Sequence, residues 1–302
     1  MDGLHKRRSA QPRAEAHRHA PRAKLVRTGT QKAKGKMMQT LTVGQTDQFV
    51  ERGYLRGLEV FSSSEMDGLR DGYRALCGLL GPDEDPGAIR EWHMASRWLY
   101  DVCSAPALLD IVEGLLGQNF YMWGSQFFAK SPRSSSTVAW HQDGYYWPLE
   151  PLHESVTAWL AFEDVDEGNG AMQVIPGSHR AGLLQHRKHI SESVLTLELE
   201  DGTFSADDAV SLKLASGQAS FHHDSIVHGS PANASDRERV GLTVRYSRAN
   251  VRCDLSRAPQ FRAYPLRGQD KGTNPVGEIP GIPFARLSPE MHIRSLDEDG
   301  ER

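Results

Sequence analysis

Near Leu41 the sequence changes to a regular pattern, in which apolar residues recur with the period of a helix. Residues 47–52 predict a short helix that Gly53 closes, since glycine commonly adopts the left-handed conformation that ends a helix. Residues 54–60 follow directly and predict a short strand. The ordered part of the chain is therefore expected to open with a helix and a strand.

Two further helices are predicted from capping patterns. The S-S-S-E segment from Ser62 to Glu65 is a capping box, in which the serine and glutamate side chains bind each other's backbone. Ser104 is expected to cap a later helix, which Gly117 ends. The apolar faces of these helices are formed by Met66, Leu69, Tyr73 and Leu76, and by Leu108, Ile111, Val112 and Leu115.

After residue 119 the pattern changes to short apolar segments bounded by glycine, proline, asparagine or aspartate, which is typical of strands. A polar loop separates the first of them from the rest, and the proline- and glycine-rich residues after 259 predict an irregular covering segment. The fold class is therefore mainly β: a double-sheet jelly roll whose N-terminal helices buttress one sheet. The predicted strands are 120–129, 156–162, 171–175, 210–214, 218–222 and 240–246.

Charge is distributed unevenly. Residues 1–36 hold eleven Lys/Arg and two acids, a formal charge of +9, which leaves −13 for the rest of a chain whose net charge is −4. Such a tail either recruits nucleic acid or a membrane, or is a disordered or upstream extension; we favour the extension, because the tail lacks aromatic residues. We therefore expect a basic tail over 1–37, one domain over 38–302 and no nucleic-acid partner, since an acidic domain repels phosphates.

Cysteines and long apolar runs narrow the class of protein further. The three cysteines, with no C-x-x-C pair, argue against a disulfide scaffold and a thiolate zinc site and suggest a reducing, cytoplasmic location. The sequence has no apolar run of 18 residues and no signal-peptide pattern. We therefore expect no membrane partner.

The segment W-H-Q-D-G (140–144) carries the clearest chemistry. Side chains two residues apart lie on the same side of an extended strand, so His141 and Asp143 can reach one cation. Two histidines and one carboxylate suit iron(II) and leave positions open for O2 and a 2-oxo acid. The third ligand has to come from further along the chain, where five candidates follow: His153, His179, His186, His222 and His228.

Among these candidates His228 stands out, because it follows a predicted strand pair and precedes a basic strand. Arg239 lies eleven residues after it, where a guanidinium can bind a carboxylate through two hydrogen bonds. Neither His222 nor His223 has an arginine at this spacing. We expect His222 to be a packed or hydrogen-bonded residue and His179 to be structural.

Three segments together resemble the phytanoyl-CoA dioxygenase-like (PhyH) family of iron(II)/2-oxoglutarate-dependent oxygenases. The resemblance covers roughly residues 45–250 and is more specific than any single motif. The matching segments are W-H-Q-D-G-Y-Y-W (140–147), E-G-N-G-A-M-Q-V-I-P-G-S-H (167–179) and H-G-S-P-A-N-A-S-D-R-E-R (228–239).

This resemblance implies a cupin-like double-stranded β-helix and a dioxygenase that hydroxylates a small molecule, using Fe(II), O2 and 2-oxoglutarate. It implies that His141, Asp143 and His228 are the catalytic metal ligands and that Arg239 binds the distal carboxylate of 2-oxoglutarate. Related halogenases carry a small residue in place of the carboxylate, so Asp143 argues for oxygen transfer. Matching positions that line the 2-oxoglutarate pocket are Ser230, Trp159 and, as a weaker match, Gln126.

The substrate is left open among acyl-CoAs, amino acids, ectoine and secondary metabolites, with a biosynthetic role preferred. Candidate substrate residues are Arg97, Arg133, Tyr145 and Trp147, since aromatic side chains and an arginine could line and anchor a pocket. Two alternatives remain: a cupin-type metal enzyme or binding module that does not use 2-oxoglutarate, and a hydroxylase of proteins or nucleic acids recruited through the basic tail. The sequence does not specify the oligomeric state.

Overall fold

The structure is a computed structural model that describes residues 40–188, 195 and 197–293. The basic tail predicted over 1–37 lies outside these residues and stays a prediction. Within the described ranges, no helix combines the length and apolar character needed to cross a membrane.

The predicted N-terminal helices are present, with one correction. Helix α1 (Val43–Arg52) ends at Gly53, whose φ of 79° is left-handed, and α2 (Ser63–Cys77) begins with the predicted capping box. Ser104 does not cap the next helix. It ends α3 (Arg97–Cys103), where its hydroxyl donates to the Tyr100 carbonyl, and α4 (Pro106–Leu116) begins two residues later with proline in its first turn.

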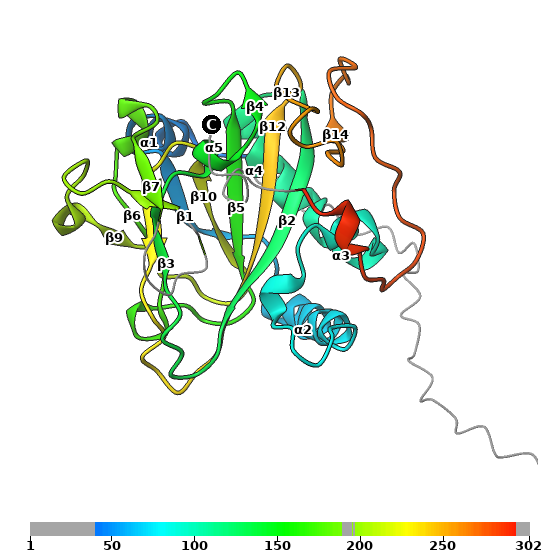
Figure 1. The fold of residues 1–302 in the computed structure, drawn as a ribbon, viewed down its shortest axis with the longest axis horizontal. Helices are drawn as coiled ribbons and strands as arrows, with labels where there is room; N and C mark the ends of the chain where they lie inside the picture. The colour runs from blue at the N-terminus through cyan, green and yellow to red at the C-terminus, as the bar shows by residue number, and fades with distance from the viewer. Residues whose placement is uncertain (1–39, 189–194, 196, 294–302) are drawn as a thin grey trace, which may run out of the picture. The chain divides into compact units, whose positions relative to one another are not determined.

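A six-stranded antiparallel sheet forms the larger layer. Its order is β1–β10–β5–β12–β2–β14, and Figure 1 shows α2 and α3 beside it. The last strand corrects the prediction that the segment after residue 259 is irregular, because residues 264–267 pair with β2. The strand bounds are β1 (Tyr54–Glu59), β2 (Phe120–Lys130), β5 (Ser155–Ala161), β10 (Gln218–His223), β12 (Arg239–Arg248) and β14 (Tyr264–Arg267).

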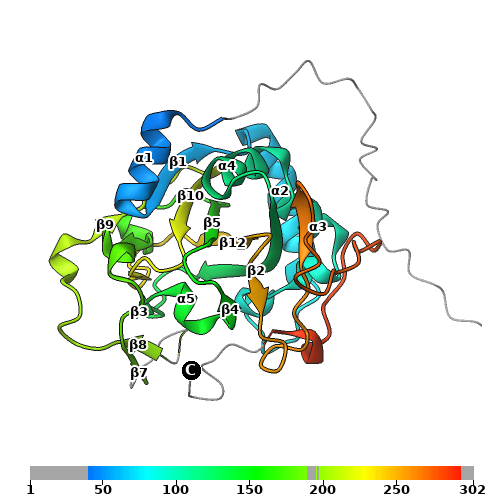
Figure 2. The ribbon, with the colours of Figure 1, turned by 90° about the horizontal axis from the view of Figure 1, so that it is seen from above.

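A four-stranded sheet forms the second layer, in the order β3–β11–β6–β9. Figure 2, which looks at the molecule from above, shows β3 across from β5 and β12, with α2 and α4 on the far side of the large sheet. Two facing antiparallel sheets with this crossed strand order form the predicted double-stranded β-helix. The strand bounds are β3 (Val138–His141), β6 (Gln173–Val174), β9 (Val210–Ser211) and β11 (His228–Ser230).

The alternation of side chains along β5 and β12 separates the core into two parts. Even-numbered residues of β12, such as Val240 and Leu242, pack with Val156 and Leu160 of β5 against the helices. Odd-numbered residues face the other way, toward the small sheet, where Trp159 joins the apolar cluster between the layers. Because strand side chains alternate with a period of two, the odd-numbered positions of these strands face the space between the sheets.

Short elements complete the fold. The turn after β3 is helical, and two further two-stranded sheets pair β13 with β4 and β7 with β8. These elements are α5 (Asp143–Tyr146), β4 (Leu149–Glu150), β7 (His186–Lys188), β8 (Leu197–Leu199) and β13 (Arg252–Cys253). The 3-10 turns are Pro86–Ala88, Trp92–Met94, Glu167–Asn169, Ser178–Ala181, Ala206–Asp208 and Pro289–Met291.

Candidate active site

The small sheet brings the predicted triad together. His141 ends β3 and His228 begins β11, and the two residues are direct cross-strand partners in the antiparallel pairing. The strand stops at His141, and Asp143 starts the helical turn α5. Gln142 between them is still extended, with φ −124° and ψ 125°. For this reason Asp143 lies on the same side as His141, as the period of two predicted.

The three side chains point their donor atoms at one another. His141 Nε2 lies 3.6 Å and His228 Nε2 3.9 Å from Asp143 Oδ1, and one ligand atom from each residue lies within 4.8 Å of the others. The two imidazole centroids are 4.0 Å apart. All three residues are buried. The cluster therefore has the spacing that one metal ion requires.

Backbone carbonyls fix the orientation of both imidazoles. His141 Nδ1 lies 2.8 Å from the Ala139 carbonyl and His228 Nδ1 3.0 Å from the Ile226 carbonyl, each two residues earlier in the chain. Nδ1 must then carry the proton, so Nε2 offers its lone pair to the cluster. Burial and the neighbouring imidazoles lower the pKa of His228 well below its usual value, which favours the neutral form that a metal binds.

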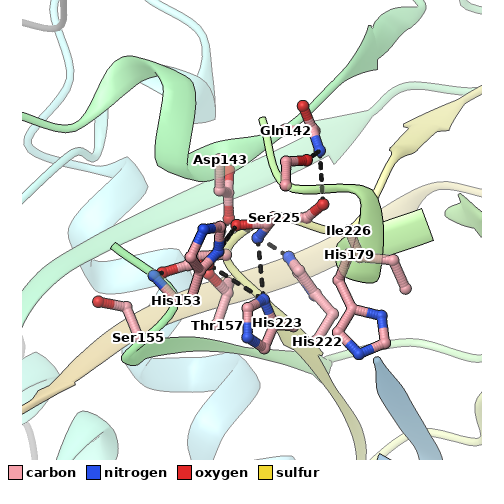
Figure 3. A network of polar contacts seen from close by, with 12 residues as sticks. Gln142, Asp143, His153, Ser155, Thr157, His179, His222, His223, Ser225 and Ile226 are labelled. Carbon is pink, nitrogen blue, oxygen red and sulfur yellow. Dashed lines mark hydrogen bonds and ion pairs between the residues drawn. The ribbon is translucent and has the colours of Figure 1, made fainter. Parts of the chain in front are cut away.

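Asp143 is held as a carboxylate by partners from the large sheet. Its Oδ2 accepts a hydrogen bond of 2.8 Å from the Thr157 hydroxyl and lies 3.3 Å from His222 Nε2 (Figure 3). Burial alone would raise the pKa of Asp143, but the contacts with His141 and His222 outweigh it and hold that pKa well below the usual value. His222 is thus a hydrogen-bonded neighbour of the triad.

Gln142 anchors the triad segment from its other side. Its side-chain amide donates to the carbonyls of Gly182 (2.8 Å) and Ser225 (2.6 Å), and its Oε1 accepts from Leu184 N–H. The residue is fully buried. The Gln142 side chain is therefore hydrogen-bonded to the surrounding loops. These bonds fix the backbone between the two candidate ligands.

A buried guanidinium lies in the same pocket as the triad. Arg239 is 2% exposed and lines the pocket with His141, Asp143 and His228. Its Nη1 donates to the Gly170 carbonyl, while no carboxylate of the described chain pairs with it and its Nε has no partner there. Burial lowers the pKa of Arg239 to about 10, so the side chain stays cationic at neutral pH.

The other residues predicted for a 2-oxoglutarate pocket also line this cavity. They are Ser230, Trp159 and Gln126. The Arg239 guanidinium lies over the Trp159 ring at 5.4 Å. Gly241 makes room for that ring, because a Cβ at this position would lie 2.0 Å from Trp159 Cζ2. The Ser230 hydroxyl is buried without a hydrogen-bond partner in the described residues.

Only one of the four predicted substrate residues reaches the pocket. Trp147 lines it. Arg97 is exposed and paired with Asp101, one helical turn away, and Arg133 is exposed and paired with Asp236 across a loop. Both guanidinium groups are thus neutralised outside the cavity.

Tyr145 also lies away from the pocket lining. Its ring stacks on His186 with centroids 3.9 Å apart. Of the three successive aromatic residues after the H-Q-D segment, Tyr146 and Trp147 line the pocket instead. The helical turn α5 explains this difference, because it breaks the strand alternation after Asp143.

Sequence reasoning missed two pocket residues that the strand pattern could have indicated. Arg245 lies six residues after Arg239 on β12, and an even spacing places both on the same face. Thr157 lies two residues before Trp159 on β5 and is the register partner of both Arg245 and His222. Either residue follows from extending the period of two along a strand already predicted.

A second cluster of titratable side chains lies beside the triad. His153, His223 and Asp224 also place ligand atoms within 4.8 Å of one another, but His153 is exposed and His223 is partly exposed. Figure 3 shows His153 and His223 near Ser225. The Ser225 hydroxyl lies 2.7 Å from His153 Nδ1 and donates to Asp224 Oδ1 at 2.7 Å. His223 Nδ1 accepts from the Ser225 N–H. Internal hydrogen bonds therefore occupy this cluster.

The fold and the pocket define a double-stranded β-helix protein with a candidate metal centre between its sheets. The family model described as "Phytanoyl-CoA dioxygenase (PhyH)" matches residues 49–241. This chain therefore belongs to the PhyH family, as the three sequence segments predicted.

Two individual relatives match a smaller part of this chain than the family model does. The peroxisomal phytanoyl-CoA dioxygenase of Bos taurus is 30% identical over 159 residues, which cover 50% of this chain and 47% of that protein. The L-proline trans-4-hydroxylase of Streptomyces griseoviridis is 28% identical over 191 residues, covering 55% of this chain and 70% of that protein. The match thus spans about half the length of the phytanoyl-CoA dioxygenases.

A solved structure agrees with the fold. The non-heme monooxygenase ThoJ in its apo form superposes with a TM-score of 0.69 at 26% sequence identity, covering 80% of this chain and 90% of that one. The similarity extends beyond the residues of the family match, and it includes the two-sheet architecture that carries the candidate metal centre.

Proposed function

We propose that this protein is an iron(II)- and 2-oxoglutarate-dependent dioxygenase that hydroxylates a small metabolite. One observation carries the proposal: a buried cluster of two histidines and one aspartate shares a pocket with a buried arginine that has no acidic partner in the described chain. Membership of the PhyH family and the resemblance to a proline hydroxylase support the same reaction class.

The cluster fits iron(II) by its donor set. Two imidazole nitrogens and one carboxylate on one side of a metal leave the remaining octahedral positions open. His141 and His228 are already oriented by the carbonyls of Ala139 and Ile226, and Asp143 is held ionised. Asp143 is thus held as the carboxylate, and His228 as the neutral imidazole, that metal binding needs.

The pocket next to the cluster fits 2-oxoglutarate by its unpaired polar atoms. The Arg239 Nε and the Ser230 hydroxyl are buried and have no partner among the described residues. Leaving a buried donor unsatisfied costs about 1–3 kcal/mol, so a ligand that supplies acceptors here is stabilised. A carboxylate between Arg239 and Ser230 satisfies both groups, and Trp159 supports the guanidinium from one side.

When bound, iron with 2-oxoglutarate supplies the oxidant, and O2 is divided between succinate and the hydroxylated product while CO2 leaves. The residues of this chain position these partners. Thr157 and His222 hold the distal oxygen of Asp143, which leaves Oδ1 directed at the two imidazoles. The aromatic walls at Trp147 and Tyr146 exclude water from the reacting centre.

The test is a set of measurements on the purified full chain under anaerobic conditions. Titration with iron(II) should give one metal per chain, and 2-oxoglutarate should then bind with the visible charge-transfer band of a chelating 2-oxo acid. On admission of O2, succinate should form at a slow basal rate that a matching substrate increases. Iron binding without any 2-oxoglutarate binding would instead favour a cupin-type metal enzyme that does not use the 2-oxo acid.

A further inference from the structure

The pocket contains a second inward-facing arginine, Arg245. It lies on the same face of β12 as Arg239, roughly 20 Å further along the strand at 3.3 Å per residue. Its register partner on β5 is Thr157, which donates to Asp143. Arg245 therefore lies level with the candidate metal centre along β12, and both arginines line the same pocket.

The chain provides space for this guanidinium but no partner for its charge. Opposite Arg245 on β2 stands Gly124, where a Cβ would lie 3.1 Å from Arg245 Cδ. The guanidinium lies 5.7 Å from the ring centroid of Trp123 and 5.6 Å from that of Trp147. Its Nε is buried, and the side chain has no hydrogen bond or ion pair with any residue that the structure describes.

Two other arginines of the described chain are paired with acids. Arg267 binds Asp110 and Glu113, and Arg187 binds Glu198 and Asp201. Arg245 is half-buried, and a cation that is partly removed from water without a partner is a candidate for ligand binding when it lines a cleft. Arg245 therefore differs from Arg267 and Arg187 in both environment and pairing.

The charges near Arg245 do not neutralise it. These charges are Asp143, Arg90 and Glu91. Asp143 belongs to the candidate metal centre. Glu91 accepts a hydrogen bond of 2.6 Å from Ile293 N–H and lies 3.5 Å from Arg90 Nε. Glu91 is thus directed at Arg90 and Asp143 at the two imidazoles, and neither carboxylate pairs with Arg245.

Resting on the proposed function, we infer that Arg245 anchors a carboxylate of the primary substrate, so that the substrate class is a small monocarboxylic acid with an apolar body. The planar guanidinium binds a carboxylate through two charge-assisted hydrogen bonds. A single unpaired guanidinium matches one negative charge, so a carboxylate fits it better than a doubly charged phosphate. Trp123, Trp147 and Phe261 line the pocket around this position and contact the apolar body.

Binding measurements on the iron- and 2-oxoglutarate-loaded protein without O2 test this inference. The probes are 3-phenylpropionate, hexanoate and N-acetylproline, each compared with its primary amide. In the parent protein at least one acid should bind about 10-fold or more tightly than its amide. Arg245→Gln should remove that preference. Arg245→Lys should retain part of it, because an ammonium keeps the charge but cannot form the two parallel hydrogen bonds of a guanidinium.

Two controls separate this inference from its alternatives. Arg248→Gln places the same substitution on the exposed end of β12 and should leave the acid preference unchanged. The affinity for 2-oxoglutarate should be the same in all four proteins, and circular dichroism checks that each variant folds. Loss of 2-oxoglutarate binding in Arg245→Gln would assign Arg245 to the co-substrate and overturn the inference.

Two further outcomes are decisive. The inference is also overturned if no acid binds better than its amide in the parent protein, or if the preference survives in Arg245→Gln. The proposed function fails in a different way, namely when the parent protein with iron does not bind 2-oxoglutarate at all. The two failures are therefore distinguished within one set of titrations.

Discussion

Two clusters of two histidines and one aspartate lie close together in the described part of the chain, and they differ in what occupies their donor atoms. In the first, His141 and His228 give Nδ1 to backbone carbonyls and direct Nε2 toward Asp143. In the second, His153 and its neighbours are hydrogen-bonded to one another through Ser225. The first cluster is buried and the second reaches the surface.

This difference shows that residue types and spacing are not sufficient to define a metal centre. A metal needs lone pairs that converge and are not otherwise engaged, and partners that fix the ligand orientation. The first cluster meets both conditions. In the second, a metal would have to displace the hydrogen bonds of Ser225 before it could be bound.

The largest expected effect comes from replacing histidines of the two clusters by alanine, one at a time. His228→Ala should abolish tight iron binding and reduce turnover by more than the roughly 10–100-fold that loss of an outer partner costs. His223→Ala and His153→Ala, as matched controls, should retain one iron per chain. Metal analysis and succinate formation measure this. If His223→Ala lost the iron and His228→Ala kept it, the assignment of the two clusters would be reversed.

Substitution of Arg239 is expected to have the next largest effect, and it should change only the binding of 2-oxoglutarate. A hydrogen bond to a charged group contributes about 1.5–3 kcal/mol, so Arg239→Ala should raise the Michaelis constant for 2-oxoglutarate by about 10-fold or more. Arg239→Lys should be intermediate, because an ammonium cannot form the paired hydrogen bonds. Iron binding in the absence of 2-oxoglutarate should be unchanged. Normal 2-oxoglutarate kinetics in Arg239→Ala would place the co-substrate elsewhere.

Substitution of His222 tests where the first cluster ends, because His222 contacts Asp143 but is not one of the three candidate ligands. His222→Phe and Thr157→Val each remove one hydrogen bond to Asp143 Oδ2. Both should keep one iron at saturation while lowering the affinity for iron by roughly 10–100-fold. Competition with a chelator measures the affinity. Complete loss of iron in His222→Phe, in a protein that still folds, would make His222 a ligand.

The smallest effect is expected from the basic tail. A protein that starts at Met38 should fold and turn over within about 2-fold of the full chain, because residues 1–37 have no apolar pattern that could join the core. Thermal unfolding and succinate formation compare the two proteins. A large loss of activity with unchanged unfolding would instead assign the tail to substrate recruitment.

The sequence by itself determined those features that depend on neighbours along the chain. The capping box at Ser62 and the end of α1 at Gly53 follow from local backbone chemistry. The shared face of His141 and Asp143 follows from the period of an extended strand. The family segments added the distal partners, because they span residues that are remote in sequence.

Only the tertiary structure decided which side chains are buried and what they contact. Ser104 had the composition of a helix cap, yet it ends α3 because the proline at the start of α4 fixes where the next helix begins. The segment after residue 259 appeared irregular by composition, yet its residues 264–267 form a strand that pairs with β2. These outcomes depend on a partner that local patterns do not contain.

The arginines illustrate the same limit within the pocket. Arg97 and Arg133 were plausible substrate anchors by sequence, but Asp101 and Asp236 neutralise them at the surface. Arg245 faces inward like Arg239, since their strand lies between β5 and β2 and its odd-numbered side chains face the small sheet. The charge of an arginine is specified by the sequence, but whether that charge is paired, solvated or directed at a ligand is decided by packing.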